Sequence, residues 1–287
     1  MIAGLGAAIG WGLADLVAAL SGRRIGAWAT VVLAQAAGAL LVSAAVVLTG
    51  ADLGGLSSVA AWLLPSAVIT AVAYLTLYRA LELGPVAVVS PVLASYAVFP
   101  VLLAVVLLGE TMSGLQVAGV VVTISGAVIT SADIRELRAG TRSMPPGLPW
   151  AIVSTVLFGV ATYVLVWASQ RAGFLPSLWL GRTASAALFV AAAPVVSRAS
   201  RRGSFSGLGS RALVLAAGLG IVDVGGTMSY AFGAEHGLVS IVTAVSATYP
   251  LIPVFGSVVV LGEHPAPNQY LGVAMVISGL VLLGLAA

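Results

Sequence analysis

The chain lacks cysteine and lysine, and it has little charge of either sign. With no Cys among its 287 residues, it can form no disulfide and no thiolate metal or redox site. Only 7% of the residues are charged, whereas soluble globular domains carry about 25%. This shortage leaves too few charges for a water-facing surface, and it excludes a soluble enzyme, a nucleic-acid-binding module and a disordered chain.

What the chain has in quantity is apolar sequence. Hydrophobic residues make up 60% of it, and the mean hydropathy is +1.14. A helix needs about 20 apolar residues to cross a bilayer, and the weak alternation of a membrane β-barrel is absent. We therefore expect an all-α integral membrane protein with ten transmembrane helices, at 2–20, 27–48, 59–82, 85–108, 113–131, 148–169, 174–196, 212–234, 238–261 and 267–286.

The second half of the chain repeats the first. At one constant offset, residue types that seldom match by chance in an apolar chain recur: Tyr96 and Tyr249, Pro100 and Pro253, Glu110 and Glu263, Gln116 and Gln269. A weaker register pairs Gly12 with Gly159, Arg24 with Arg171, and Gln35 with Arg182. We expect a five-helix repeat at 1–131, a basic loop at 132–147 and a second five-helix repeat at 148–287. Because five is odd, the repeats would enter the membrane from opposite sides, as in alternating-access transporters.

Short motifs carry a resemblance to a known family. The pair Trp11-Gly12 in the first block, the Gly-Glu that ends the fourth, and the duplicated Gly-Glu…Gln…Gly…Ser-Gly pattern resemble the drug/metabolite transporter superfamily, EamA type. Arg182 stands where many members carry an Arg. Over essentially the whole chain, the resemblance implies a ten-helix carrier of small metabolites with a central cavity between its halves. We expect it in a prokaryotic cytoplasmic membrane as a multi-pass protein.

Three charged residues lie well inside predicted spans: Asp15, Arg182 and Asp223. Each costs about 2.5–3.5 kcal/mol on insertion scales, so each needs a reason to be there.

No basic segment precedes the first block, so we expect it to be a retained span and not a cleaved signal peptide. Its sequence around Asp15 also looks like the first helix of the small multidrug transporters, in which a carboxylate binds protons and cations in competition. Alternatively, Asp15 pairs permanently with an Arg or reaches the headgroups.

Arg182 and Asp223 admit two interpretations. They could form a structural pair, or Arg182 could bind an anionic group of the substrate while Asp223 takes part in coupling, because a guanidinium holds a carboxylate through two hydrogen bonds. One Arg cannot neutralise two aspartates. If all three residues face one cavity, one acid is left to titrate or to bind a cation.

Spans four and nine are the best-repeated pair, and they contain prolines. A proline frees a carbonyl and bends a helix, which is tolerated where the bend lines a cavity. We predict that Tyr96 and Tyr249 wall the substrate site from opposite repeats. Ser95, Thr248 and Tyr78 are predicted to contribute to this site, with Pro100 and Pro253 as hinges; Tyr74, Tyr163 and Tyr230 are further candidates. The alternative is hinge prolines with hydroxyls that only pack between helices.

Glu110 and Glu263 each precede a predicted span, and we expect them to stabilise its N-terminus. No phosphate-cradling loop, Ser-His-Asp set or metal-ligand spacing is visible. We therefore expect no enzyme activity, no cofactor and no metal.

Arginine is unevenly distributed between the predicted connections. Nine Arg fall in loops of one side: Arg23, Arg24, Arg135, Arg138, Arg142, Arg198, Arg201, Arg202 and Arg211; Arg171 alone falls on the other. Positively charged loops stay in the cytoplasm, which predicts termini outside, whereas the resemblance implies cytoplasmic termini.

The sequence thus favours a secondary transporter, more readily an exporter, that moves a small metabolite by alternating access with proton coupling. An organic-cation efflux carrier is the main alternative, ahead of a membrane-embedded enzyme or a channel. The expected partners are a small-molecule substrate and the bilayer, with no nucleic acid. A monomer would suffice, and a homodimer stays open.

Overall fold

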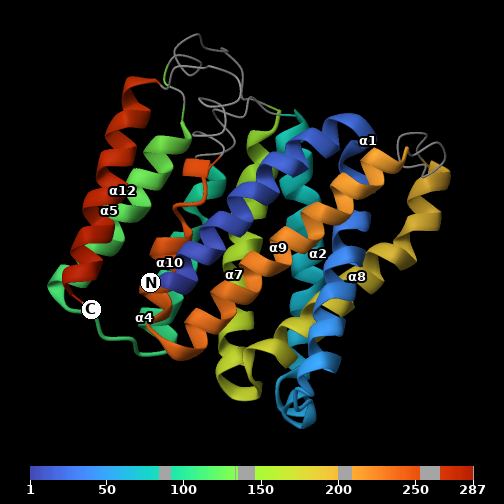
Figure 1. The fold of residues 1–287 in the computed structure, drawn as a ribbon, viewed down its shortest axis with the longest axis horizontal. Helices are drawn as coiled ribbons and strands as arrows, with labels where there is room; N and C mark the ends of the chain where they lie inside the picture. The colour runs from blue at the N-terminus through green and yellow to red at the C-terminus, as the bar shows by residue number, and fades with distance from the viewer. Residues whose placement is uncertain (84–91, 133, 135–145, 200–208, 253–265, 287) are drawn as a thin grey trace.

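The computed structural model describes residues 1–83, 92–132, 134, 146–199, 209–252 and 266–286, and within these ranges every regular element is a helix (Figure 1). The α-helices are α1 (Ile2–Thr49), α2 (Ala60–Leu83), α4 (Val98–Leu107), α5 (Gly114–Ser131), α7 (Leu148–Ala172), α8 (Phe174–Ala199), α9 (Ser210–His236), α10 (Val239–Ser246) and α12 (Pro267–Leu285); η1 (Gly54–Ser58) and η2 (Ser95–Ala97) are short 3-10 helices.

Nine helical segments coincide with nine of the ten predicted blocks. Six are long and apolar enough to cross a membrane: Arg24–Thr49, Ala60–Leu83, Leu148–Ala172, Phe174–Pro194, Leu213–His236 and Pro267–Leu285. Three shorter ones are Ile2–Ala18, Val92–Leu107 and Gly114–Thr130. The block at 238–261 is described only as far as residue 252, so the count of ten spans stays a prediction.

The first two blocks differ from the prediction in how they are joined. The predicted spans at 2–20 and 27–48 leave 21–26 as a connection between them, but the helix continues past Arg24 and breaks at Gly26. Gly26 has φ 82° and ψ 156°, and Gly173, between α7 and α8, has φ 82° and ψ 150°. Only glycine adopts this conformation readily. The two glycines occupy equivalent positions in the weaker register of the repeat, so each half breaks its first helix pair in the same way.

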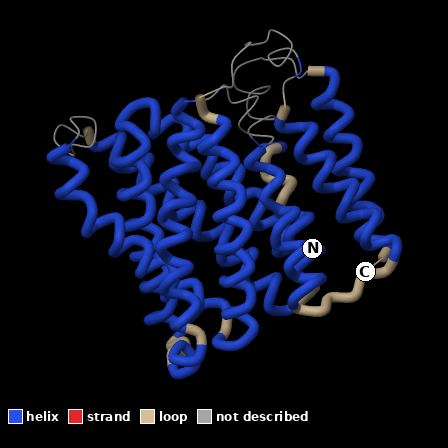
Figure 2. Tube along the Cα trace, turned by 180° about the vertical axis from the view of Figure 1, so that it is seen from behind, coloured by secondary structure: helices blue, strands red, loops and turns tan. Residues whose placement is uncertain are grey.

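The helices α5 and α12 form an antiparallel pair that stands side by side in both views (Figures 1 and 2). Gly119 packs against Gly279, and Gly126 packs against Gly272, so one helix ascends where the other descends. Gln116 donates from Nε2 to the carbonyl of Ala286 (3.2 Å), and its equivalent Gln269 donates to that of Thr130 (3.1 Å). The repeated glycines and glutamines are therefore reciprocal contacts between equivalent helices that run in opposite directions.

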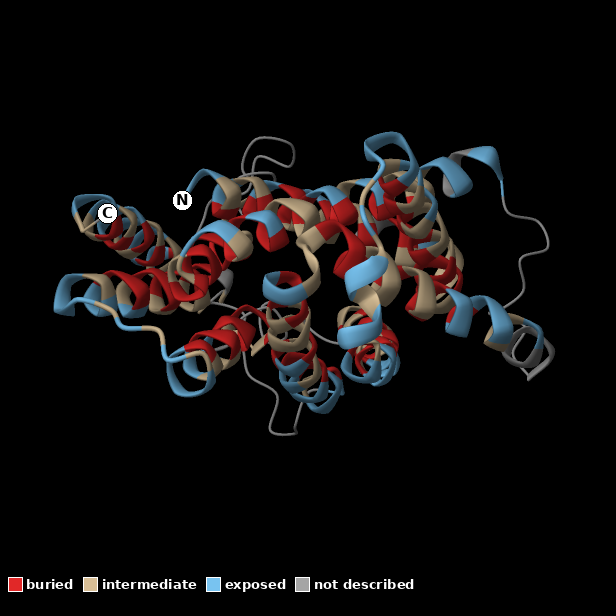
Figure 3. Cartoon of the chain, turned by 90° about the horizontal axis from the view of Figure 1, so that it is seen from below, coloured by how far each residue is buried: buried red, intermediate tan, exposed pale blue. Residues whose placement is uncertain are grey.

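The two halves also interlock elsewhere. Gly12 packs against Ile252, and its equivalent Gly159 packs against Phe99, which is the equivalent of Ile252. The helix α9 lies against α1, and α2 lies against α7. Figure 3 shows buried residues where helices face one another and exposed residues toward the outside.

The connections after α1, α4, α7 and α9 gather at one end of the bundle, the lower end in Figure 1. Both chain termini belong to this end, since Ala3 packs against Gly233 near the end of α9, and Ala286 accepts the hydrogen bond from Gln116 at the start of α5. We call it the terminal face.

One prediction about helix ends is wrong. Glu110 does not stabilise α5, which is capped by Ser113 and Gln116 through a reciprocal pair of hydrogen bonds. The carboxylate of Glu110 accepts hydrogen bonds at the start of α10 instead. Glu263 lies outside the described residues.

Candidate functional site

A cavity of about 170 Å³ lies between the two halves of the chain. Its wall is mostly apolar and aromatic, with a few polar side chains. Small-molecule sites have this composition, because apolar surface supplies affinity and a few polar groups fix orientation. The polar and aromatic residues at the wall are Trp11, Asp15, Ser66, Thr70, Tyr74, Tyr78, Tyr96, Thr155, Phe158, Thr162, Arg182, Asp223, Thr227 and Tyr249.

One wall of the cavity is a hydrogen-bonded network around Arg182. The guanidinium forms an ion pair with Asp223 through Nη2, and its Nη1 donates to Gln35 Oε1 (2.9 Å) and to the hydroxyl of Tyr74 (3.1 Å). Tyr74 in turn donates to the carboxylate of Asp223, with oxygen separations of 2.9 and 3.1 Å. Gly38 leaves room for the guanidinium, because a Cβ there would come within 3.1 Å of Nε.

The network leaves Arg182 little capacity for a substrate anion. Arg182 is 5% exposed and Asp223 is 8% exposed, and a buried ion pair with additional hydrogen bonds is costly to break. Nη1 and Nη2 are both occupied, and Nε faces Gly38. The pair is thus charge-neutral, and within the described residues Nε of Arg182 is buried without a hydrogen-bond partner.

Asp15 has a different environment. It lines the same cavity, but within the described residues its carboxylate has no ion-pair or hydrogen-bond partner. Aromatic rings line the cavity with it: Trp11 meets Tyr96 edge-on at 6.1 Å between ring centroids, and Tyr96 lies 6.3 Å from Tyr249. Trp11 is held by a hydrogen bond from Nε1 to the hydroxyl of Thr227 (3.2 Å). The cavity therefore combines one satisfied acid with one that is available.

Both halves of the chain match a known protein family. Residues 1–132 and 145–285 each match the EamA-like transporter family. The chain belongs to the EamA-like transporter family. It is thus a multi-pass membrane protein with a transporter fold built from two repeats.

The structural comparison agrees with this fold. A solved structure described as "Crystal structure of protein" is 20% identical, with a TM-score of 0.76 over 99% of this chain and 96% of the other. At that identity the likeness establishes the fold alone. Comparison with curated proteins gave no match.

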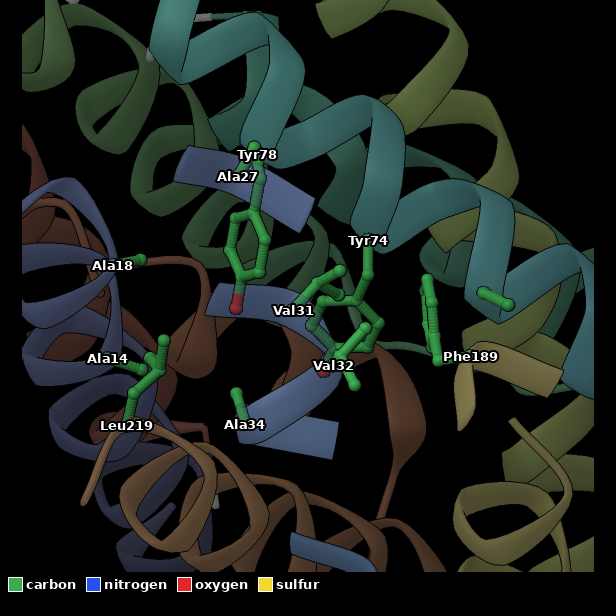
Figure 4. Close-up of a cluster of buried hydrophobic side chains, with 11 residues drawn as sticks. Ala14, Ala18, Ala27, Val31, Val32, Ala34, Tyr74, Tyr78, Phe189 and Leu219 are labelled. Carbon is green, nitrogen blue, oxygen red and sulfur yellow. The ribbon is translucent and has the colours of Figure 1, made fainter. Parts of the chain in front are cut away.

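In this EamA-like transporter, seven residues singled out from the sequence line one cavity: Asp15, Tyr74, Tyr78, Tyr96, Arg182, Asp223 and Tyr249. Tyr78 projects from α2 beside Tyr74, and both rings point toward α1 near Val31 and Val32 (Figure 4). The chain thus draws these residues from both halves into one place.

Other predicted site residues lie elsewhere. Ser95 and Thr248 are not among the lining residues, and their hydroxyls donate to the carbonyls of Val92 (2.6 Å) and Val245 (2.7 Å). A hydroxyl that bonds its own preceding turn is satisfied locally, so the predicted contribution of both residues to the cavity does not match their positions.

The remaining predicted residues lie in the core, away from the cavity or outside the described residues. Pro100 is buried in α4, and Pro253 lies outside the described residues. Tyr230 is buried and bonded to Thr243 (2.7 Å), and Tyr163 does not line the cavity. No group of three potential metal ligands occurs in the described part of the chain.

The sequence did not single out several members of the site: Gln35 of the network, and Ser66, Thr70, Thr155, Phe158, Thr162 and Thr227 of the cavity wall. Gln35 was aligned with Arg182 by the repeat, yet nothing indicated that the two side chains bond to each other. Thr227 was not predicted, although the sequence holds a signal for it. Its position four residues after Asp223, on the same helix face, could have placed it beside the cavity.

Proposed function

We propose that this EamA-like transporter is a secondary carrier that exports a small metabolite from a prokaryotic cell by alternating access, with the cavity as its substrate site. The antiparallel packing of α5 on α12 supports an inverted pair of five-helix repeats, because the two are equivalent helices of the two halves. The reciprocal contacts of Gly12 and Gly159 support the same symmetry. An inverted repeat allows the two halves to exchange conformations and so expose one site to each side in turn.

The observation that carries the proposal is that one acid at the cavity, Asp223, has a charged partner and the other, Asp15, has none among the described residues. Arg182 neutralises Asp223, whereas Asp15 faces the cavity without a partner among the described residues. An unpaired carboxylate inside a membrane protein is unfavourable unless it takes up a proton or a cation. We therefore assign Asp15 as the exchangeable charge of the carrier, and Arg182 with Asp223 as the fixed wall.

A second candidate, efflux of an organic cation, rests on the aromatic residues of the cavity. Trp11, Tyr96 and Tyr249 line it together with Asp15. Aromatic faces attract cations by about 0.5–2 kcal/mol each, most strongly where water is excluded. An amine would then bind to Asp15 directly, and protons would compete with it for the same carboxylate.

Asp15→Asn separates the two candidates in proteoliposomes loaded with amino acids, sugars, nucleosides or organic cations. For a proton-coupled carrier of a neutral metabolite, we expect the variant to lose accumulation driven by a pH gradient but to retain exchange of labelled for unlabelled substrate. For a cation carrier, both activities should be lost.

Asp52→Asn is the matched control, because Asp52 only accepts a hydrogen bond from Gly54 (2.8 Å) in an exposed connection. It should keep both activities. Full pH-driven accumulation in Asp15→Asn would refute the role of Asp15, and a large substrate-independent current would indicate a channel.

A further inference from the structure

Glu110 makes a contact between the two halves at the terminal face. It lies between α4 and α5, and its carboxylate reaches the first turn of α10 in the second half. Oε1 accepts from the backbone nitrogen of Val239 (2.6 Å), and Oε2 accepts from the backbone nitrogen (3.1 Å) and the hydroxyl (2.6 Å) of Ser240. Both oxygens are therefore used across the boundary between the repeats.

This contact is chemically strong and not required by the neighbouring helix. Hydrogen bonds to a carboxylate are roughly twice as strong as neutral ones, and the N-terminus of a helix favours a negative charge. The helix α5 has its own cap in Ser113 and Gln116. The carboxylate of Glu110 is thus available to cap the first turn of α10, which belongs to the other repeat.

Next to this contact, apolar side chains from several helices pack together. Val239 and Val242 of α10 form a buried cluster with Ala104 of α4, Val166 of α7 and Tyr230 of α9. All of these are at most 3% exposed. Trp11, which lines the cavity, packs against the same cluster. The cluster therefore connects Trp11 of the cavity wall with Val239, the residue at the start of α10 that Glu110 binds.

We propose that Glu110 is a latch between the repeats that keeps the terminal face closed, and that its release from Val239 and Ser240 accompanies opening of the cavity to that face. The proposal rests on the alternating-access function. In a carrier of this kind the contacts that seal one face must break once in every cycle. A set of polar contacts at the rim can do so at low cost, because water replaces each lost hydrogen bond as the face opens.

The test uses the absence of cysteine from the chain. Thr70→Cys introduces one thiol at the cavity wall. Its reaction rate with a membrane-impermeant maleimide, applied at the terminal face of oriented vesicles, reports how often that face is open. A C-terminal tag identifies the vesicle orientation. We expect Glu110→Ala to raise this rate about tenfold, which corresponds to about 1.4 kcal/mol. Glu110→Gln and Ser240→Ala, which each remove part of the contact, should raise it less.

Glu235→Ala is the matched control. Glu235 also accepts a backbone hydrogen bond at a helix start, from Phe174 (2.9 Å), but both residues belong to the second half. Its labelling rate should stay that of the parent. Equal rates in Glu110→Ala and the parent, or an equal rise in Glu235→Ala, would overturn the latch. If Glu110→Ala fails to fold, unchanged rates in Glu110→Gln and Ser240→Ala overturn it instead.

The labelling needs no substrate, so it is independent of the transport assay. Faster labelling without transport of any tested compound would support the latch and count against the carrier assignment. Transport with unchanged labelling would refute the latch alone.

Discussion

Arg182 is the residue on which the polar wall of the cavity depends. Arg182→Met would leave the Asp223 carboxylate buried with Tyr74 as its remaining partner. Removing one member of a buried ion pair costs about 3–5 kcal/mol. We expect a loss of this size in the free energy of unfolding, measured by denaturant titration in detergent.

The double variant Arg182→Met with Asp223→Asn removes both charges and should recover much of this loss, because no uncompensated charge remains. Arg79→Met is the comparison at an exposed pair. Arg79 contacts Glu82 at 2.8 Å with side chains 43% and 29% exposed, and such pairs contribute about 0–1 kcal/mol. Additive losses in the double variant would mean that Arg182 and Asp223 do not act as a pair.

Individual residues differ in how far the sequence could predict them. Charge inside an apolar span is costly, and this alone singled out Asp15, Arg182 and Asp223, which all line the cavity. The partners of a charge could not be predicted in the same way. Whether Arg182 contacts Gln35 depends on how α1 and α8 are rotated about their axes. The sequence does not define this rotation, because both helices are mostly apolar and show no clear amphipathic face.

Hydroxyl groups were the least predictable. Ser95 and Thr248 lie next to tyrosines that line the cavity, yet both bond to the preceding turn of their own segment. This local hydrogen bond is available to any Ser or Thr in a helix. Sequence cannot decide whether such a side chain turns inward to its backbone or outward to a cavity.

At the scale of helices, close packing of α5 on α12 depends on glycine. A methyl group at Gly279 would overlap the hydroxyl and backbone nitrogen of Thr123, whereas one at Gly284 on the same helix would meet nothing within 4 Å. We expect Gly279→Ala to lower the free energy of unfolding by about 1–3 kcal/mol, the usual cost of overpacking. Gly284→Ala should be neutral or slightly stabilising, because Ala favours helix.

Thermal unfolding of the two variants in the same detergent checks this expectation. Equal stability would contradict the close approach of α5 and α12. The repeat had marked Gly272 and Gly279 as equivalents of Gly119 and Gly126, but it could not say that the equivalent helices pack on each other. That contact between segments far apart in the chain arises only when both halves are assembled.

For the whole molecule, the distribution of arginine predicts the orientation in the membrane. Arg171 ends α7 at the terminal face, whereas the connections rich in Arg join helix ends at the opposite end of the bundle. Arg in short loops is retained in the cytoplasm. We therefore expect the terminal face, with both chain termini, to lie outside.

Single thiols in the cysteine-free chain test this orientation. Ser57→Cys places one in η1 at the terminal face, and Ser210→Cys places one at the start of α9 at the opposite end; both serines are exposed. On intact cells, an impermeant maleimide should label the Ser57→Cys variant and spare Ser210→Cys until the membrane is opened. The reverse pattern would place the termini in the cytoplasm and would mean that the fold overrides the arginine bias. Partial labelling of both variants would mean that the chain inserts in both orientations, which an inverted repeat with nearly equivalent halves would permit.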